Sequence, residues 1–252
     1  MPTVSKINNL AHSKYAQGVM FSEWLSKEGY SKQLLQKYRS AGWLTPVCRG
    51  VMSMRDSMPN ALDCLACYNE QMGKSFRVAA HSALELAGFN HYVPMGKPIL
   101  MVACTDKTIP AWMKSDKLDR TFVTFSTEAF PDVATSTYET GNFELLISAP
   151  EQAFMECLLL APQRYSFMDL FYIMEQLAPM RPDVVQHLLE TSTNYKVKRL
   201  FLYMAEKASH YWADMLDKSK IDIGTSKIQL AKGGTYVPQY KMTIPKGLHD
   251  YE

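Results

Sequence analysis

The chain has 252 residues, of which 47% are hydrophobic and 21% are charged, enough for the core of one large domain or two modest ones. Its longest apolar runs are far too short to span a bilayer, and the N-terminus lacks the apolar segment of a signal peptide, so a cytoplasmic protein without membrane contact is predicted. Five scattered cysteines, an odd number, argue against a disulfide framework and fit a reducing compartment.

The formal net charge of +2 is unevenly distributed along the chain. Residues 1–58 contain eight Lys and Arg against three Asp and Glu, a net charge of +5, which leaves −3 for the remainder. A basic segment on a mildly acidic body is typical of a region that meets a polyanion. On charge alone, a solvated surface that happens to be basic is an equally good interpretation.

The N-terminal region has the pattern of three short helices followed by a β-hairpin. The helices are predicted at residues 5–12, 22–28 and 31–41, and the hairpin strands at residues 44–47 and 51–54. Ser5 and Ser22 are the expected N-caps, and Ser31 begins the third helix. Trp43 and Leu44 are expected to anchor the next stretch in the core. This order of elements predicts a winged helix-turn-helix, a DNA-binding domain over residues 1–58.

Beyond Met58-Pro59 the sequence predicts a larger mixed α/β domain, residues 59–252. Helices are predicted at residues 61–72 and 82–87, strands at 99–103, 120–125 and 143–147, and further helices at 151–160, 166–177, 182–190 and 195–208. Short strands are expected again between residues 221 and 244. The predicted fold class is therefore α+β, with an N-terminal winged helix-turn-helix followed by a larger domain whose C-terminal half is helical.

The polar side of the third predicted helix carries the residue types that read DNA. Gln pairs with adenine edges, and Lys or Arg pairs with guanine edges or phosphates, so Lys32, Gln33 and Gln36 are placed nearest the bases. Lys37 and Arg39 are expected to contact the phosphate backbone. The start of the helix at Ser31 is also expected to attract a phosphate, because the backbone N–H groups there are free and the helix dipole favours negative charge. The predicted DNA-binding set is Ser31, Lys32, Gln33, Gln36, Lys37, Arg39 and Ser40, with Arg49 at the hairpin tip reaching a minor groove or a phosphate.

No motif of catalytic or metal-binding residues is complete in the sequence. Cys64 and Cys67 form a CxxC pair, but no second pair or closely spaced His pair completes a zinc site, so packed thiols are favoured. His81 and His91 bracket a predicted helix and are expected to make structural hydrogen bonds. The sequence therefore predicts a protein that is not an enzyme and holds no metal and no cofactor.

Three cations stand at the start of a strongly apolar helix near the C-terminus. Lys196, Lys198 and Arg199 precede the run Leu200-Phe201-Leu202. One interpretation is a patch that binds an anionic partner or nucleic acid. The other is that their long side chains cap a core helix and keep only the charged ends near water.

Several short stretches follow one another along nearly the whole chain: Ser5-Lys6-Ile7-Asn8, Gly42-Trp43-Leu44, Arg49-Gly50-Val51, Ala83-Leu84-Glu85-Leu86-Ala87-Gly88 with His91-Tyr92, Pro110-Ala111-Trp112, Lys196-Val197-Lys198-Arg199-Leu200-Phe201-Leu202, and Lys232-Gly233-Gly234 through Tyr240 to Pro245. As an ordered set, they resemble the AbiEi-like antitoxins of abortive-infection, type IV toxin–antitoxin systems. The resemblance implies a transcriptional autoregulator that binds inverted repeats of double-stranded DNA in its own promoter. It further implies a C-terminal domain that counteracts a nucleotidyltransferase-like toxin in phage defence, with direct binding of the toxin left open.

Two other hypotheses compete with the autoregulatory antitoxin. A ligand-sensing winged-helix transcription factor unrelated to a toxin predicts an apolar pocket with convergent polar groups. An enzyme with a winged-helix appendage predicts several carboxylates with perturbed pKa, or a metal, in one cleft.

Overall fold

The computed structural model describes residues 5–57, 59–89, 96–104 and 109–251. Its contacts divide the chain into two compact units. The first unit comprises Met1–Val78, Pro94–Phe125 and Thr137–Leu146, and the second comprises Ala79–Val93, Ser126–Ser136 and Ile147–Glu252. The mixed α/β fold class is confirmed, whereas the division into domains 1–58 and 59–252 stays a prediction. Within the described ranges no helix is long and apolar enough to cross a membrane.

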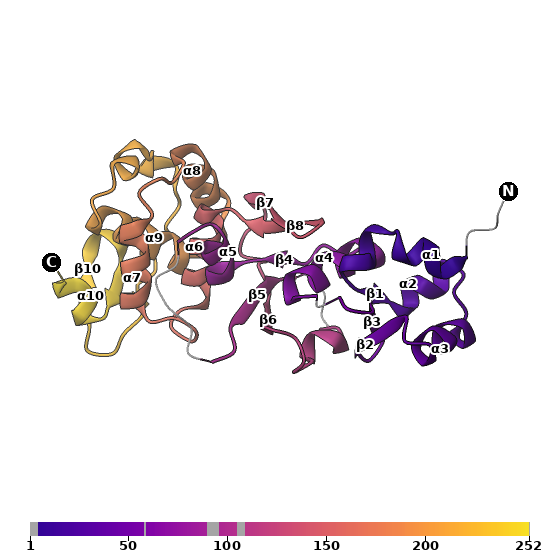
Figure 1. The fold of residues 1–252 in the computed structure, drawn as a ribbon. Coiled ribbons are helices and arrows are strands. Elements are labelled where there is room, and N and C mark those ends of the chain that lie inside the picture. Colours follow the sequence, from indigo (N-terminus) through magenta and orange to yellow (C-terminus); the bar gives the residue numbers. More distant parts are fainter. Residues whose placement is uncertain (1–4, 58, 90–95, 105–108, 252) are drawn as a thin grey trace. The chain divides into compact units, whose positions relative to one another are not determined.

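The winged helix-turn-helix predicted at the N-terminus is present in the first unit (Figure 1). Its helices are α1 (Lys6–Ala11), α2 (Ser22–Lys27) and α3 (Lys32–Ser40), and its wing strands are β2 (Leu44–Cys48) and β3 (Val51–Met54). The sequence pattern missed a short strand, β1 (Met20–Phe21), that pairs antiparallel with β3. These strands form a sheet in the order β1-β3-β2.

Local capping explains where these helices begin and end. The hydroxyl of Ser5 accepts a hydrogen bond from the backbone N–H of Asn8 at 3.4 Å, which satisfies one free donor at the start of α1. The prediction that Ser22 caps α2 is wrong, because Ser22 is the first helical residue and the N-cap is Phe21, the last residue of β1. Gly29 follows α2 with a φ of +81°, a left-handed conformation that a residue without a Cβ adopts freely.

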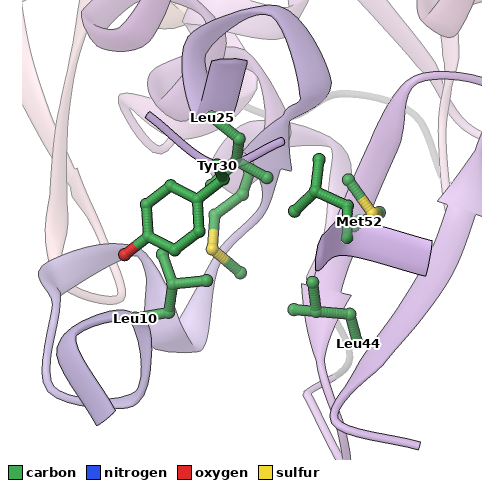
Figure 2. Close-up of a cluster of buried hydrophobic side chains, with 7 residues drawn as sticks. Leu10, Leu25, Tyr30, Leu44 and Met52 are labelled. Carbon is green, nitrogen blue, oxygen red and sulfur yellow. The ribbon is translucent and has the colours of Figure 1, made fainter. Parts of the chain in front are cut away.

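A single apolar cluster holds the winged helix-turn-helix together (Figure 2). Its seven buried members are Leu10, Met20, Leu25, Tyr30, Leu35, Leu44 and Met52. Each of the three helices and three strands contributes one of them, and Tyr30 lies in the turn between α2 and α3. Tyr30 keeps its polar end satisfied by donating its hydroxyl hydrogen to the Lys6 backbone oxygen at 3.1 Å. Because every element contributes to this one cluster, the position of α3 depends on all the others.

Helix α4 (Ala61–Met72) has the predicted bounds and contacts the winged helix within the first unit. The amide of Gln71, 7% exposed, accepts from the Phe21 N–H at 2.9 Å and donates to the Val19 oxygen at 2.7 Å. Gly18 lies so close to α4 that an added Cβ would stand 2.7 Å from the Sγ of Cys67. Both features fix the backbone that leads into β1.

A five-stranded sheet follows α4, in the order β6-β5-β4-β8-β7. Its strands are β4 (Arg77–Val78), β5 (Ile99–Ala103), β6 (Thr121–Phe125), β7 (Thr135–Thr140) and β8 (Phe143–Ser148). β5 pairs parallel with β6 and antiparallel with β4. The prediction located β5, β6 and β8 but missed β4 and β7, because β4 has two residues and β7 is mostly polar and exposed.

The second unit is built around a helix with little exposed surface. Helices α5 (Ala80–Leu86), α6 (Pro150–Leu160), α7 (Phe167–Gln176), α8 (Pro182–Thr191) and α9 (Tyr195–Lys207) are its main elements. Residues 151–158 of α6 are all buried, and α5, α7, α8 and α9 contact this helix. A small sheet of β9 (Ile228–Gln229), β10 (Thr235–Val237) and β11 (Met242–Ile244) precedes α10 (Lys246–Asp250). The predicted helical C-terminal half is therefore confirmed.

An ion pair between a buried carboxylate, Glu151, and an exposed guanidinium, Arg181, makes the stability of this unit sensitive to acid. Burial alone would raise the pKa of the Glu151 carboxyl, but hydrogen bonds from the side chain and backbone N–H of Arg181 hold it below its ordinary value. The side-chain contacts are bidentate, both at 2.9 Å. A carboxyl that binds its proton less readily in the folded chain stabilises the fold above its ordinary pKa of 4.5, and this contribution is lost as the pH falls through the folded-state pKa.

We therefore expect Glu151→Gln to lower the stability at pH 7 and to flatten its decline between pH 7 and pH values below 4.5. Urea unfolding of the full chain across this range measures both effects. Glu139→Gln, at an exposed position of β7, is the matched control and should behave like the wild type. Parallel pH profiles for wild type and Glu151→Gln would contradict the assignment.

Candidate nucleic-acid interface

Helix α3 presents one polar face to solvent and one apolar face to the core. Leu35 is buried and Leu34 and Tyr38 are partly buried against the apolar cluster. With about 100° between successive helical residues, Lys32, Gln33, Gln36, Lys37 and Ser40 occupy one continuous arc on the other side. All five are exposed, as are Arg39 at the edge of the arc and Ser31 at its start.

Among the residues that the structure describes, the cations of this face have no other partner. No described residue forms an ion pair or side-chain hydrogen bond with Lys32, Lys37 or Arg39. The sequence has no Asp or Glu between Glu28 and Asp56, and Glu23 of α2 pairs with Lys27 at 3.1 Å. The arc therefore carries free positive charge next to amide side chains that donate and accept hydrogen bonds.

Ser31 caps the N-terminus of α3. Its hydroxyl accepts from the Leu34 N–H at 3.2 Å, so it is the N-cap of α3. A capping hydroxyl fixes the first turn and leaves the N–H groups at the helix start pointing outward, the arrangement that attracts a phosphate. Ser31 therefore holds the first turn of α3, and its contact with a phosphate stays a prediction.

The wing brings Arg49 to an exposed position at its tip. A register shift between Pro46 and Cys48 bulges β2, and Gly50 turns the chain with a φ of +79°. The Gly50 oxygen accepts a hydrogen bond from the Ser22 N–H at 2.9 Å, which ties the wing tip to the start of α2. Arg49 therefore stands on a fixed turn, and none of the residues that the structure describes forms an ion pair or a side-chain hydrogen bond with it.

Trp43 lies on the surface, contrary to the expectation that it anchors the core. Its side chain is 52% exposed, whereas its neighbour Leu44 is 2% exposed and belongs to the apolar cluster. Successive residues of a strand point to opposite sides, so Leu44 at the start of β2 leaves the preceding side chain outside. An exposed aromatic side chain thus follows α3 directly before the wing, at a position where the sequence predicted a core residue.

The three cations near the C-terminus are internal groups of the second unit. Lys196 donates to the backbone oxygens of Leu159 and Ala161, at 2.9 and 2.6 Å, around the C-terminal end of α6. Lys198 approaches the Glu190 oxygen at the end of α8, at 3.4 Å. Positive charge is favoured at such helix ends, where carbonyls lack partners.

Arg199 is held even more completely, at 1% exposure. Its guanidinium donates to the oxygens of Ile223, Ser226 and Lys241, at 2.7, 2.8 and 3.1 Å. Lys198 is also buried, at 3% exposure. These contacts fit a structural role for Lys196, Lys198 and Arg199, but the charged ends of Lys198 and Arg199 are buried rather than kept near water. We make no proposal of a partner patch there.

The CxxC thiols are packed in the first unit. Cys64 and Cys67 are buried and free, and burial raises the pKa of Cys67 to about 12. Across the part of the chain that the structure describes, no group of three or more His, Cys, Asp or Glu residues is arranged to hold a metal ion. His81 contacts the Tyr165 hydroxyl through Nδ1 at 2.6 Å, the structural hydrogen bond expected of it, whereas His91 lies outside the described residues.

Comparison with solved structures identifies a similar fold. The crystal structure of the RV2827C protein from Mycobacterium tuberculosis matches with a TM-score of 0.63 and 14% sequence identity, over 94% of this chain and 88% of that one. At this identity the match shows the fold alone. No curated protein sequence matches the chain.

Two family models match the sequence, one after the other. Residues 3–95 match the N-terminal domain of the AbiEi antitoxin, described as a transcriptional regulator. Residues 97–245 match the model described as "Transcriptional regulator, AbiEi antitoxin, Type IV TA system". Because these models together span nearly the whole chain, the protein belongs to the AbiEi antitoxin family, the transcriptional regulators of type IV toxin–antitoxin systems.

Proposed function

We propose that the protein represses its own operon by placing the polar arc of α3 in the major groove of promoter DNA. The observation that supports this proposal is the free, exposed face of Lys32, Gln33, Gln36 and Lys37 on a helix fixed by the apolar cluster. Lys32, Gln33 and Gln36 face the bases, while Lys37 and Arg39 contact phosphates. Arg49 of the wing reaches a neighbouring groove or phosphate.

A single winged helix contacts few phosphates and binds weakly, so two or more copies share the site. The proposed operator is therefore an inverted repeat, each half of which takes one copy. As the antitoxin, the protein counteracts a nucleotidyltransferase-like toxin in the cytoplasm, and neither role requires a catalytic step.

The test of this proposal is binding of the full chain to its own upstream DNA with salt titrated. Each lost phosphate contact reduces the slope of log K against log salt by about 0.9. We expect Lys37→Ala to weaken binding to every duplex to a similar degree and to flatten the slope by about this amount. Fluorescence anisotropy on labelled promoter and scrambled duplexes measures both quantities.

Lys246→Ala is the control for the loss of one positive charge, because Lys246 is exposed on α10 in the second unit. It should leave both the affinity and the slope at their wild-type values. If Lys37→Ala and Lys246→Ala change the slope equally, the contact assigned to Lys37 does not exist.

A further inference from the structure

We propose that a pocket at the base of the wing binds a small aromatic anion and that its occupation weakens DNA binding. The second half of this inference rests on the proposed function, whereas the first half stands on the geometry of the pocket. The pocket lies within the first unit. Its walls come from β1, the start of α2, the wing, α4, and the 3-10 helix η2 (Ala111–Lys114) together with Pro110.

The pocket has the size and lining of a small-molecule site. Its volume is about 350 Å³, within the range typical of ligand pockets. Three aromatic side chains line it: Phe21, Tyr68 and Trp112. Their ring centroids lie 5.1 to 5.6 Å apart in tilted or edge-to-face arrangements. Such walls favour a flat, aromatic ligand, which packs on the rings.

The charges at the rim favour an anion. Arg49 lines the pocket, and none of the described residues pairs with its guanidinium. The carboxylate at the rim, Glu23, is already paired with Lys27. The aromatic walls and the cation at the rim together fit an aromatic carboxylate.

The position of Arg49 links this pocket to DNA. An anion that pairs with the guanidinium withdraws it from a phosphate or minor groove, since one side chain serves one partner at a time. The coupling is reciprocal, so DNA must weaken ligand binding by the same factor. A metabolite with this chemistry would relieve repression without any contact to α3.

Indole-3-acetate is a suitable probe, with the neutral indole-3-acetamide as its charge control. Isothermal titration of the full chain without DNA should show saturable 1:1 binding of the anion and at least tenfold weaker binding of the amide. Ala111→Trp fills the pocket from its exposed wall and should abolish binding. Ala87→Trp, at the exposed C-cap of α5, is the matched control and should bind like the wild type. Circular dichroism confirms that both variants are folded.

Absence of binding to the wild type at millimolar probe, or equal binding to wild type and Ala111→Trp, would overturn the pocket assignment. The coupling is tested separately, by promoter affinity with and without saturating indole-3-acetate. We expect the probe to weaken wild-type DNA binding several-fold and to leave Ala111→Trp unaffected. Probe binding with unchanged DNA affinity would refute the coupling, whereas failure of the ligand-free chain to bind promoter DNA would refute only the proposed function.

Discussion

Replacing Lys32 and Gln33 together with alanine is expected to weaken binding to the promoter repeat by at least about 30-fold, since each base contact is worth roughly 1–3 kcal/mol. Binding to a scrambled duplex should fall much less, because only the single charge of Lys32 is lost there. The ratio of the two affinities, measured by anisotropy at one fixed salt concentration, is therefore the quantity that reports base recognition.

A matched pair of substitutions separates base recognition from a general effect of charge and polarity. Lys227→Ala with Gln229→Ala removes the same two side-chain types from exposed positions of the second unit. This control should keep the wild-type ratio between promoter and scrambled duplexes. An unchanged ratio for the Lys32 and Gln33 double variant would show that the polar arc of α3 does not read the bases.

The second large effect concerns the core beneath that arc. Leu25 of α2 is fully buried in the apolar cluster (Figure 2). Leu25→Ala is expected to cost about 2–5 kcal/mol of stability, the sum of lost burial and the cavity left behind. Since helix α3 rests on the same cluster, its amide hydrogens should exchange faster and promoter binding should fall with them.

Leu25→Met provides the control, because it conserves volume and should cost less than about 1.5 kcal/mol. Hydrogen exchange followed by mass spectrometry measures the protection of α2 and α3 without assuming that both units unfold together. Equal protection in the Leu25→Ala variant and the wild type would mean that this cluster does not support α3.

The parts of the fold that sequence predicted are those set by local chemistry. α4 and β5 have the predicted bounds, because Asn60 and Gly73 delimit the helix and an apolar run defines the strand. The polar arc of α3 could also be predicted from the sequence, since helical spacing alone places Lys32 and Gln36 on a different side of the helix from Leu35.

The parts that sequence missed depend on partners far along the chain. β1 exists because Met20 and Phe21 pair with Met52 and Val51, and two residues leave no periodicity to detect. Likewise, the burial of Arg199 follows from carbonyls 24 to 42 positions away, so its sequence neighbours did not reveal it. The pocket beside the wing also combines segments that only the fold brings together.

The amide of Gln71 has a practical consequence for anyone who shortens the protein. A fragment that stops at residue 58 would leave the Val19 oxygen and the Phe21 N–H without their hydrogen-bond partner, because that partner, the Gln71 side chain, belongs to α4. A fragment that runs through Met72 keeps Gln71 and the whole of α4, and so keeps these backbone groups satisfied. Crystallisation or DNA footprinting of the winged helix-turn-helix alone should therefore use a fragment that includes α4.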